Sequence, residues 1–153
     1  MWVPPEDIDP IQFLAPTRKS ISLFGAVNLR QGQWVNSFEE TFNAMTFENF
    51  LLNLLKHRAK ERRIIAVLDN ARYHHAKILA PFLRKHRHLL HLEFLPPYSP
   101  NLNPIERVWK LTRRLCTHNR YFPQLDELLE VVSKQMCIWS KPNPELRKLC
   151  CII

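Results

Sequence analysis

The sequence predicts an α/β fold in which a mixed sheet is flanked by helices, and three observations lead to this class. The second half of the chain alternates short apolar runs with segments of helical periodicity, which is typical of α/β sandwiches. The first half contains two strand-like runs on either side of Gly32, which indicates a hairpin. At 153 residues, of which 46% are hydrophobic, the chain is long enough to bury the core that such a fold requires.

The predicted elements follow one another in the order β-β-α-β-α-β-α-α, after a proline-punctuated loop over Met1–Thr17. Strands are expected where β-branched and apolar residues alternate or form a short continuous run. They are Lys19–Leu29, Gln33–Phe38, Arg63–Leu68 and His91–Leu95. The third of these is a continuous apolar run, so we expect it to be buried on both faces of the sheet.

Four helices are expected where apolar residues recur at helical spacing. They are Thr46–Ala59 with Thr46 as its N-cap, a basic amphipathic helix over Ala76–His86, Pro104–His118, and Gln124–Trp139. In the third helix, one face carries the apolar stripe Ile105, Val108, Leu111, Thr112 and Leu115. Glu106 and three cations lie on or near the other side of that helix.

Composition favours a polyanion as partner. Lys and Arg number 22 against 14 Asp and Glu, so the net charge is +8 and the pI is about 9.6. The four cysteines form no C-x-x-C pair, which argues against a zinc site. No apolar run reaches the length of a membrane span, and Met1–Pro10 does not resemble a signal peptide. We therefore expect a cytoplasmic protein that does not enter a membrane.

Two carboxylates are the candidate reactive groups, and each has a plainer alternative. Asp69 directly follows a predicted strand, where ligands gather in open α/β sheets, but Asp-Asn is also good turn chemistry. Glu106 stands three residues after Asn103, so it fits a capping box, and it also fits an ion pair with Lys110. Local spacing alone does not choose between these alternatives.

Two longer motifs carry a family resemblance. Leu68–His74 (LDNARYH) resembles the motif around the second catalytic aspartate of mariner-like bacterial insertion-sequence transposases, which are DDE-superfamily endonucleases. Leu95–Trp109 (LPPYSPNLNPIERVW) is similar to the signature around the last acidic residue of that family. The strand Leu23–Val27 and the loop containing Trp2 also resemble the early core. The resemblance covers roughly Trp2 to Val132.

The resemblance implies an RNase H-like fold and DNA transposition by metal-dependent strand cleavage and transfer. Three acids hold two Mg²⁺ or Mn²⁺ ions in this family, and two such ions can clamp the attacking and leaving oxygens at phosphorus. Asp69 and Glu106 match the second and third acids, so both are expected as catalytic residues and metal ligands. Residues 1–140 would form a partial catalytic domain and residues 141–153 a C-terminal tail.

DNA is the implied partner, at transposon ends and at the target. The expected DNA-contacting residues are Asn70, His74, Lys110, Arg113 and Arg114. For His74 two roles stay open, because it would either approach a substrate phosphate or steady the loop of Asp69. Phosphate contacts by the cations would be independent of DNA sequence and sensitive to salt.

The chain departs from the family pattern at its beginning. The first catalytic aspartate should lie on a central strand before the Trp2 loop, and the early acids Glu6, Asp7 and Asp9 stand among prolines instead. We therefore expect an amino-terminally truncated, nucleoid-associated chain whose first strand is missing. It would be inactive alone, and it would need the missing amino-terminal part or a homodimer partner. The alternative is a non-catalytic remnant that binds DNA or an intact transposase.

Overall fold

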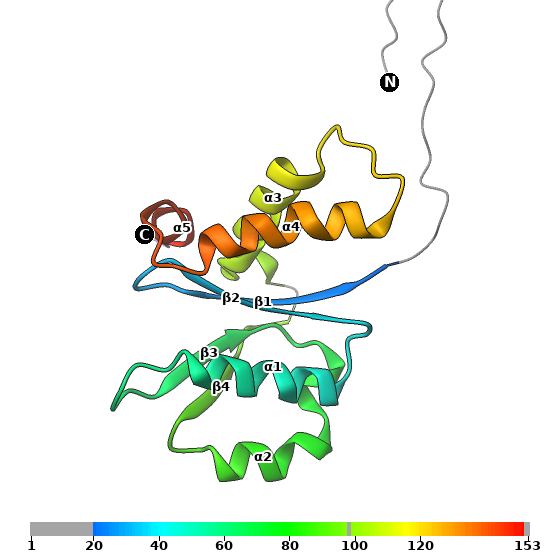
Figure 1. Cartoon of the computed structure of the whole chain (residues 1–153). Helices are drawn as coiled ribbons and strands as arrows, with labels where there is room; N and C mark the ends of the chain where they lie inside the picture. The colour runs from blue at the N-terminus through cyan, green and yellow to red at the C-terminus, as the bar shows by residue number, and fades with distance from the viewer. Residues whose placement is uncertain (1–19, 98, 152–153) are drawn as a thin grey trace, which may run out of the picture.

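The computed structural model describes residues 20–97 and 99–151, and within them it contains two small sheets and five α-helices (Figure 1). Strands β1 (Ser22–Asn28) and β2 (Gln33–Glu39) form an antiparallel hairpin. Strands β3 (Ile64–Leu68) and β4 (Leu90–Phe94) pair in parallel. The predicted α/β class is confirmed. The expected loop over Met1–Thr17 lies outside the described residues.

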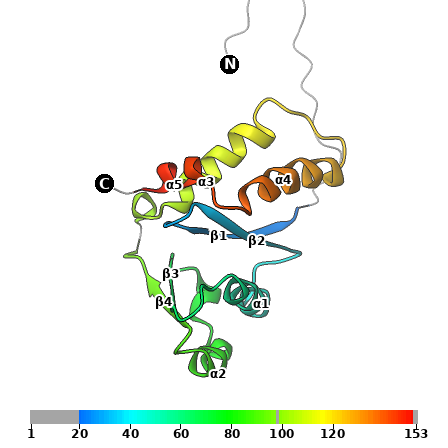
Figure 2. The ribbon, with the colours of Figure 1, turned by 60° about the vertical axis from the view of Figure 1, so that its left-hand side comes forward.

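The helices occupy two layers on either side of the hairpin. In both views, α1 and α2 lie on one side of β1–β2, while α3, α4 and α5 lie on the other (Figures 1 and 2). Their bounds are α1 Ala44–Lys56, α2 Ala80–Lys85, α3 Ile105–Thr112, α4 Leu125–Trp139 and α5 Pro144–Cys150. Short 3₁₀ segments η1 (Arg72–His75), η2 (Lys77–Leu79) and η3 (Pro100–Leu102) and the π-helical turn η4 (Arg113–Thr117) complete the set.

Two hydrophobic cores lie on opposite faces of the hairpin, because successive strand residues point to opposite sides. Phe24 and Val35 belong to the first core, which α1, α2 and one face of β3–β4 complete. Trp34 belongs to the second core, together with residues of α3, α4 and α5. The hairpin is therefore the shared central layer of the molecule.

The hairpin turn is held against the last helix. Gly32 has φ of +68°, and a Cβ there would lie 2.0 Å from the carbonyl oxygen of Asn143, the N-cap of α5. The backbone amide of Asn143 donates to the carbonyl of Gln31 at 2.9 Å. A left-handed conformation and close backbone approach both favour glycine at this position.

The predicted burial of the third strand on both faces is wrong. Ile65 and Val67 are 66% and 48% exposed, whereas Ile64, Ala66 and Leu68 pack against the first core. An apolar run suits two-sided burial only when a second layer covers the strand. Within residues 20–97 and 99–151, no such layer covers the outer face of β3.

The predicted helix over Ala76–His86 is shorter than expected. The chain there forms the 3₁₀ segment η2 and then α2, which begins at Ala80 with Pro81 at its amino end. Pro81 has no N–H to donate to the carbonyl of Lys77, as a continuous α-helix would need, and Ala76 is extended with ψ of 130°. Residues 76–79 therefore do not continue as one α-helix with α2.

The other helices correct the prediction at their ends. The N-cap of α1 is Asn43, whose side chain accepts from two amides, and Thr46 is the reciprocal partner in that capping box. The third helix passes into the π-helical turn η4 after Thr112. The region expected as a tail contains α5, which buries Leu146 and Cys150 in the second core.

In the part of the chain that the structure describes, no helix combines the length and the apolar character that a membrane crossing requires.

Candidate functional site

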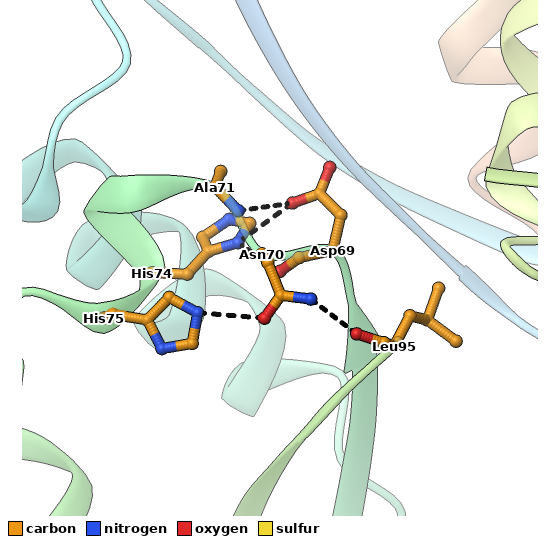
Figure 3. A network of polar contacts seen from close by, with 6 residues as sticks. All are labelled: Asp69, Asn70, Ala71, His74, His75 and Leu95. Atoms are coloured by element: carbon orange, nitrogen blue, oxygen red, sulfur yellow. Dashed lines mark hydrogen bonds and ion pairs between the residues drawn. The ribbon is translucent and has the colours of Figure 1, made fainter. Parts of the chain in front are cut away.

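Asp69 lies immediately after the carboxyl end of β3, where the strand fixes its backbone (Figure 3). One carboxylate oxygen, Oδ1, accepts from the backbone amide of Ala71 at 3.1 Å and lies 3.2 Å from Nδ1 of His74. The side chain is nevertheless 66% exposed. Among the described residues, Oδ2 has no hydrogen-bond partner, so Asp69 is held by one oxygen and offers the other.

His74 supports Asp69 from within the first core. Its Nδ1 also lies 3.0 Å from the backbone carbonyl of Asp69, so Nδ1 faces two acceptors and carries the proton that it donates. The ring is 8% exposed, with its centroid 4.4 Å from the ring centroids of Phe47 and Tyr73. Burial lowers the pKa of His74, although the carbonyl and the charge of Asp69 act in the opposite direction.

At neutral pH the Asp69–His74 contact is therefore a hydrogen bond that the neutral imidazole donates to the carboxylate, rather than an ion pair. The same carboxylate also acts on Tyr73. Burial raises the pKa of the Tyr73 phenol, and the negative charge of Asp69 raises it further. Tyr73 is thus a neutral member of this group.

Asn70 joins the ends of the two parallel strands. Its side-chain amide donates to the carbonyl of Leu95, the residue after β4, and its Oδ1 accepts from Nε2 of His75 at 3.2 Å (Figure 3). The amide of Leu95 in turn donates to the carbonyl of Leu68 at 2.9 Å. Both polar ends of Asn70 are thereby used within the protein.

Glu106 lies in the first turn of α3 and is half-buried. The capping box that its spacing would also fit is not formed, because the N-cap is Pro104 and no side chain caps this helix. The Oδ1 atom of Asn103 instead accepts from the amide of Ile105 at 3.4 Å. Within residues 20–97 and 99–151, the Glu106 carboxylate has neither a hydrogen bond nor an ion pair with Lys110.

The two carboxylates line the same cavities. One cavity of about 280 Å³ and another of about 180 Å³ both include Asp69, Asn103 and Glu106 in their walls. Asn70 lines the smaller one. Hard, oxygen-rich donors of this kind fit Mg²⁺ or Mn²⁺. The described residues contain no group of three His, Cys, Asp or Glu that could hold a metal ion, so the donor set here stops at two acids.

The expected DNA-contacting cations are exposed, and they follow Glu106 along the chain. Lys110 lies one turn after Glu106 on α3, and Arg113 and Arg114 lie on η4. They add positive charge to the element that carries Glu106. Whether these three residues contact DNA stays a prediction, and so does DNA contact by Asn70 and by the buried His74.

One structural feature of the site was missed from the sequence. A Cβ at Gly25 on β1 would lie 2.3 Å from the ring of Trp34 and 2.8 Å from that of Trp109. Trp34 and Trp109 pack edge to face at 5.1 Å, and Trp109 lines the larger cavity beside Glu106. A glycine inside an otherwise apolar strand was the available signal.

The sequence model of one protein family, described as DDE superfamily endonuclease, matches residues 2–129. A curated relative is the uncharacterized protein y4pE/y4sA of Sinorhizobium fredii (strain NBRC 101917 / NGR234). It is 29% identical over 119 residues, which are 78% of this chain and 82% of the relative.

Among solved structures, a chain in the crystal structure of the Mos1 Strand Transfer Complex is similar. The TM-score is 0.67 at 20% sequence identity, over 98% of this chain but only 44% of the Mos1 chain. This chain thus spans less than half the length of that neighbour. The likeness extends to the fold, and the expected RNase H-like architecture is confirmed at that level.

Proposed function

The chain belongs to the DDE superfamily endonuclease family, and from this premise we propose that Asp69 and Glu106 are two carboxylates of a metal-dependent DNA-cleaving site used in transposition. The observation that carries the proposal is their convergence from β3 and α3 on the same two cavities. Oxygens of both side chains are without protein partners among the described residues, as metal ligands need to be.

Each neighbouring residue has a defined part in this proposal. His74 and the amide of Ala71 hold one oxygen of Asp69, so the other oxygen is presented in a fixed direction. Such supporting contacts orient a ligand before the metal arrives. Asn70 fixes the spacing of the β3 and β4 ends from which the Asp69 loop and the Asn103–Glu106 segment depart.

Bound Mg²⁺ or Mn²⁺ would supply charge stabilisation for an in-line displacement at a DNA phosphorus atom. Asp69 and Glu106 would hold the metal, and a third acid would come from outside residues 20–97 and 99–151. Lys110, Arg113 and Arg114 would hold the DNA backbone near Glu106 through phosphate contacts. The strand transfer complex among the structural neighbours supports DNA as the partner.

Manganese binding tests the donor pair directly. We expect the purified chain to bind Mn²⁺ as measured by electron paramagnetic resonance, and Asp69→Asn or Glu106→Gln to weaken that binding by at least about tenfold, or about 1.4 kcal/mol. Glu130→Gln is the matched control, because Glu130 is an exposed carboxylate on α4 whose partner is Lys134. Equal Mn²⁺ affinity in all four proteins would refute the assignment.

We also propose a second function, which the net charge of +8 favours. In that case the chain binds DNA, or associates with an intact transposase, without cutting. Plasmid nicking in Mn²⁺ separates the two functions. Nicking that is lost in Asp69→Asn supports the endonuclease, whereas a DNA mobility shift without nicking, unchanged in Asp69→Asn, supports the binding module.

A further inference from the structure

The positive charge of the chain is concentrated in two short segments. One runs from Lys56 to Arg63, between α1 and β3, and the other runs from Arg84 to Leu89, between α2 and β4. Together they contain eight Lys and Arg and one acid, so their net charge is +7, against +8 for the whole chain. The rest of the chain holds the other 14 of the 22 cations and 13 of the 14 acids, so it is nearly neutral.

The fold brings the two segments together at one end of the β3–β4 sheet. Because β3 and β4 are parallel and Ile64 pairs with Leu90, the residues that precede the two strands lie at the same edge. The amide of Ile64 donates to the carbonyl of Leu89 at 2.8 Å, and the Arg63 guanidinium donates to the carbonyl of Leu90 at 3.5 Å. Figure 1 shows both connections on the left of the molecule.

Seven cations of these segments are exposed, and we call them the basic edge. They are Lys56, Lys60, Arg62, Arg63, Arg84, Lys85 and Arg87. The ion pairs found in the part of the chain that the structure describes include none of them. The eighth cation, Arg58, is half-buried and donates to the carbonyls of Ala59 and Arg62, so it shapes the loop.

Helix ends account for only part of this charge. Lys56 stands in the last turn of α1, and Arg84 and Lys85 stand in the last turn of α2, where the helix dipole stabilises cations. The other four residues of the basic edge lie beyond both helices. Like charges gathered at one edge repel one another in the folded chain, and a bound polyanion would remove that repulsion.

We propose that the basic edge is a second nucleic-acid surface, which binds the phosphodiester backbone away from the candidate metal site. Six residue steps of β-strand separate Arg63 from Asp69, so a phosphate at the basic edge lies about 20 Å from the Asp69 carboxylate. The cations that follow Glu106 belong to α3 and η4, and α3 lies on the other side of the hairpin from α1 and α2 (Figures 1 and 2). The basic edge is separate from both.

The chemistry of the basic edge favours nucleic acid over other anionic partners. Four of its seven cations are Arg, whose planar guanidinium pairs with two phosphate oxygens at once. No large hydrophobic side chain is exposed within 56–63 or 84–89, whereas a surface that enters a lipid headgroup layer needs an apolar face. A nucleic-acid duplex offers an unbroken row of charge, about one per 1.7 Å of its axis, for a row of cations to neutralise.

The basic edge does not depend on the proposed function. None of its residues lines either of the cavities that include Asp69 and Glu106, so it is unchanged if the metal site is absent. Phosphate contacts carry no base-sequence information directly. The basic edge would therefore hold DNA against the protein without selecting the position of a cut.

Covalent labelling of the unsubstituted full chain tests the location. Lysines are acetylated with an N-hydroxysuccinimide ester in EDTA, with and without a DNA duplex of about 20 base pairs. We expect the duplex to slow acetylation of Lys60 and Lys85 at the same DNA concentration and to leave the exposed Lys141 unchanged. Protection of Lys110 without Lys60 and Lys85, protection of only one of these two, or no protection of either would overturn the proposal.

Matched variants test the charge, by fluorescence anisotropy of the same duplex in EDTA. One variant combines Lys60→Gln, Arg62→Gln, Arg84→Gln and Arg87→Gln. It should bind at least about tenfold more weakly, with a slope of log affinity against log salt concentration reduced by about 3 to 4. The control removes four exposed cations outside the two segments, through Arg30→Gln, Lys134→Gln, Lys141→Gln and Lys148→Gln. Equal weakening in both variants would overturn the proposal. Because EDTA removes metal, these results are independent of the Mn²⁺ experiment.

Two competitors test the class of partner. Polyglutamate at an equal concentration of negative charge should displace the duplex at least about tenfold less well than unlabelled DNA does. Vesicles that contain phosphatidylserine should not protect Lys60 or Lys85 from acetylation. Displacement by polyglutamate as effective as that by DNA, or protection of these lysines by the vesicles, would overturn the assignment to nucleic acid.

Discussion

At the scale of single residues, His74 connects the core to the candidate site. Its ring packs between Phe47 and Tyr73, and its Nδ1 faces both the carbonyl and the carboxylate of Asp69. Of the two roles left open by the sequence, burial favours support of the Asp69 loop. The sequence alone could not decide, because Phe47 belongs to α1 and lies far from His74 along the chain.

The lowered pKa of His74 predicts a pH dependence of stability. The folded protein disfavours protonation of a buried imidazole, whereas the unfolded chain protonates it near the ordinary value of 6.5. Below that pH the unfolded state binds more protons, so the free energy of unfolding falls as pH falls, by at most about 1.4 kcal/mol per pH unit for one proton. Above it, this contribution is constant.

We therefore expect urea unfolding, followed by tryptophan fluorescence at pH 7.5 and 5.5, to show a smaller pH-dependent loss in His74→Gln than in the unsubstituted chain. His75→Gln is the control, because His75 is the exposed neighbour in the same 3₁₀ segment. An identical pH dependence in all three proteins would contradict the burial argument. The comparison uses the difference between the two pH values, so a general loss of stability in His74→Gln does not affect it.

Asp69 and Glu106 could be selected from the sequence because long motifs surround them, and the structure brings them to common cavities. Their local contacts could not be predicted. Glu106 has the spacing of a capping box, yet Pro104 rather than Asn103 is the N-cap. The residue at which a helix starts depends on the backbone conformation of the preceding 3₁₀ turn, and residue spacing does not determine that conformation.

At the scale of elements, the start of α1 rests on a reciprocal cap. Asn43 accepts from the amides of Met45 and Thr46, each at 2.9 Å, and Thr46 accepts from the Asn43 amide at 3.0 Å. We expect Asn43→Ala to lower the free energy of unfolding by about 1 kcal/mol. Asn49→Ala, the same substitution at an exposed interior position of α1, should be neutral or slightly stabilising. Chemical denaturation of both variants measures the difference, and equal effects would contradict the cap.

At Gly25, β1 packs closely against Trp34 of the second core and against Trp109. We expect Gly25→Ala to destabilise the chain by about 1–3 kcal/mol, because its Cβ would overlap Trp34. The destabilisation should shrink in a Trp34→Leu background, since the smaller side chain removes the overlap. A double-mutant cycle in urea isolates this coupling. Additive effects of the two substitutions would show that the strain lies elsewhere.

Most strands and helices could be predicted because their periodicity is local, and the errors arise where tertiary context decides. The run Ile64–Leu68 is apolar throughout, but only a covering layer would bury Ile65 and Val67, and the sequence does not state which faces are covered. In the same way α5 was not expected, since its burial depends on Trp34 and Val108 from distant elements.

At the scale of the whole molecule, DNA binding through three specific cations and DNA binding through net charge alone predict different salt dependences. If Lys110, Arg113 and Arg114 contact phosphates, replacing all three by Ala should reduce the slope of log affinity against log salt concentration by about 2 to 3. Replacing Lys134, Lys141 and Lys148 removes the same charge from exposed positions in and around α4 and α5. A smaller change in that control, measured by fluorescence anisotropy across salt concentrations, is expected. Equal changes in both triple variants would point to net charge alone.

The two cores also differ in when the chain can complete them. The buried members of the first core lie between Phe24 and Leu90, whereas the second core joins Trp34 to residues from Val108 to Cys150. A ribosome makes the chain from its amino end, and domains fold as their parts emerge. The face of the hairpin that carries Phe24 can therefore be covered midway through synthesis. The face that carries Trp34, and the turn at Gly32, are covered only after α5 has been made. In an interrupted or nicked chain, the apolar face that carries Trp34 would stay exposed. This face is therefore the surface that nascent-chain quality control would recognise first.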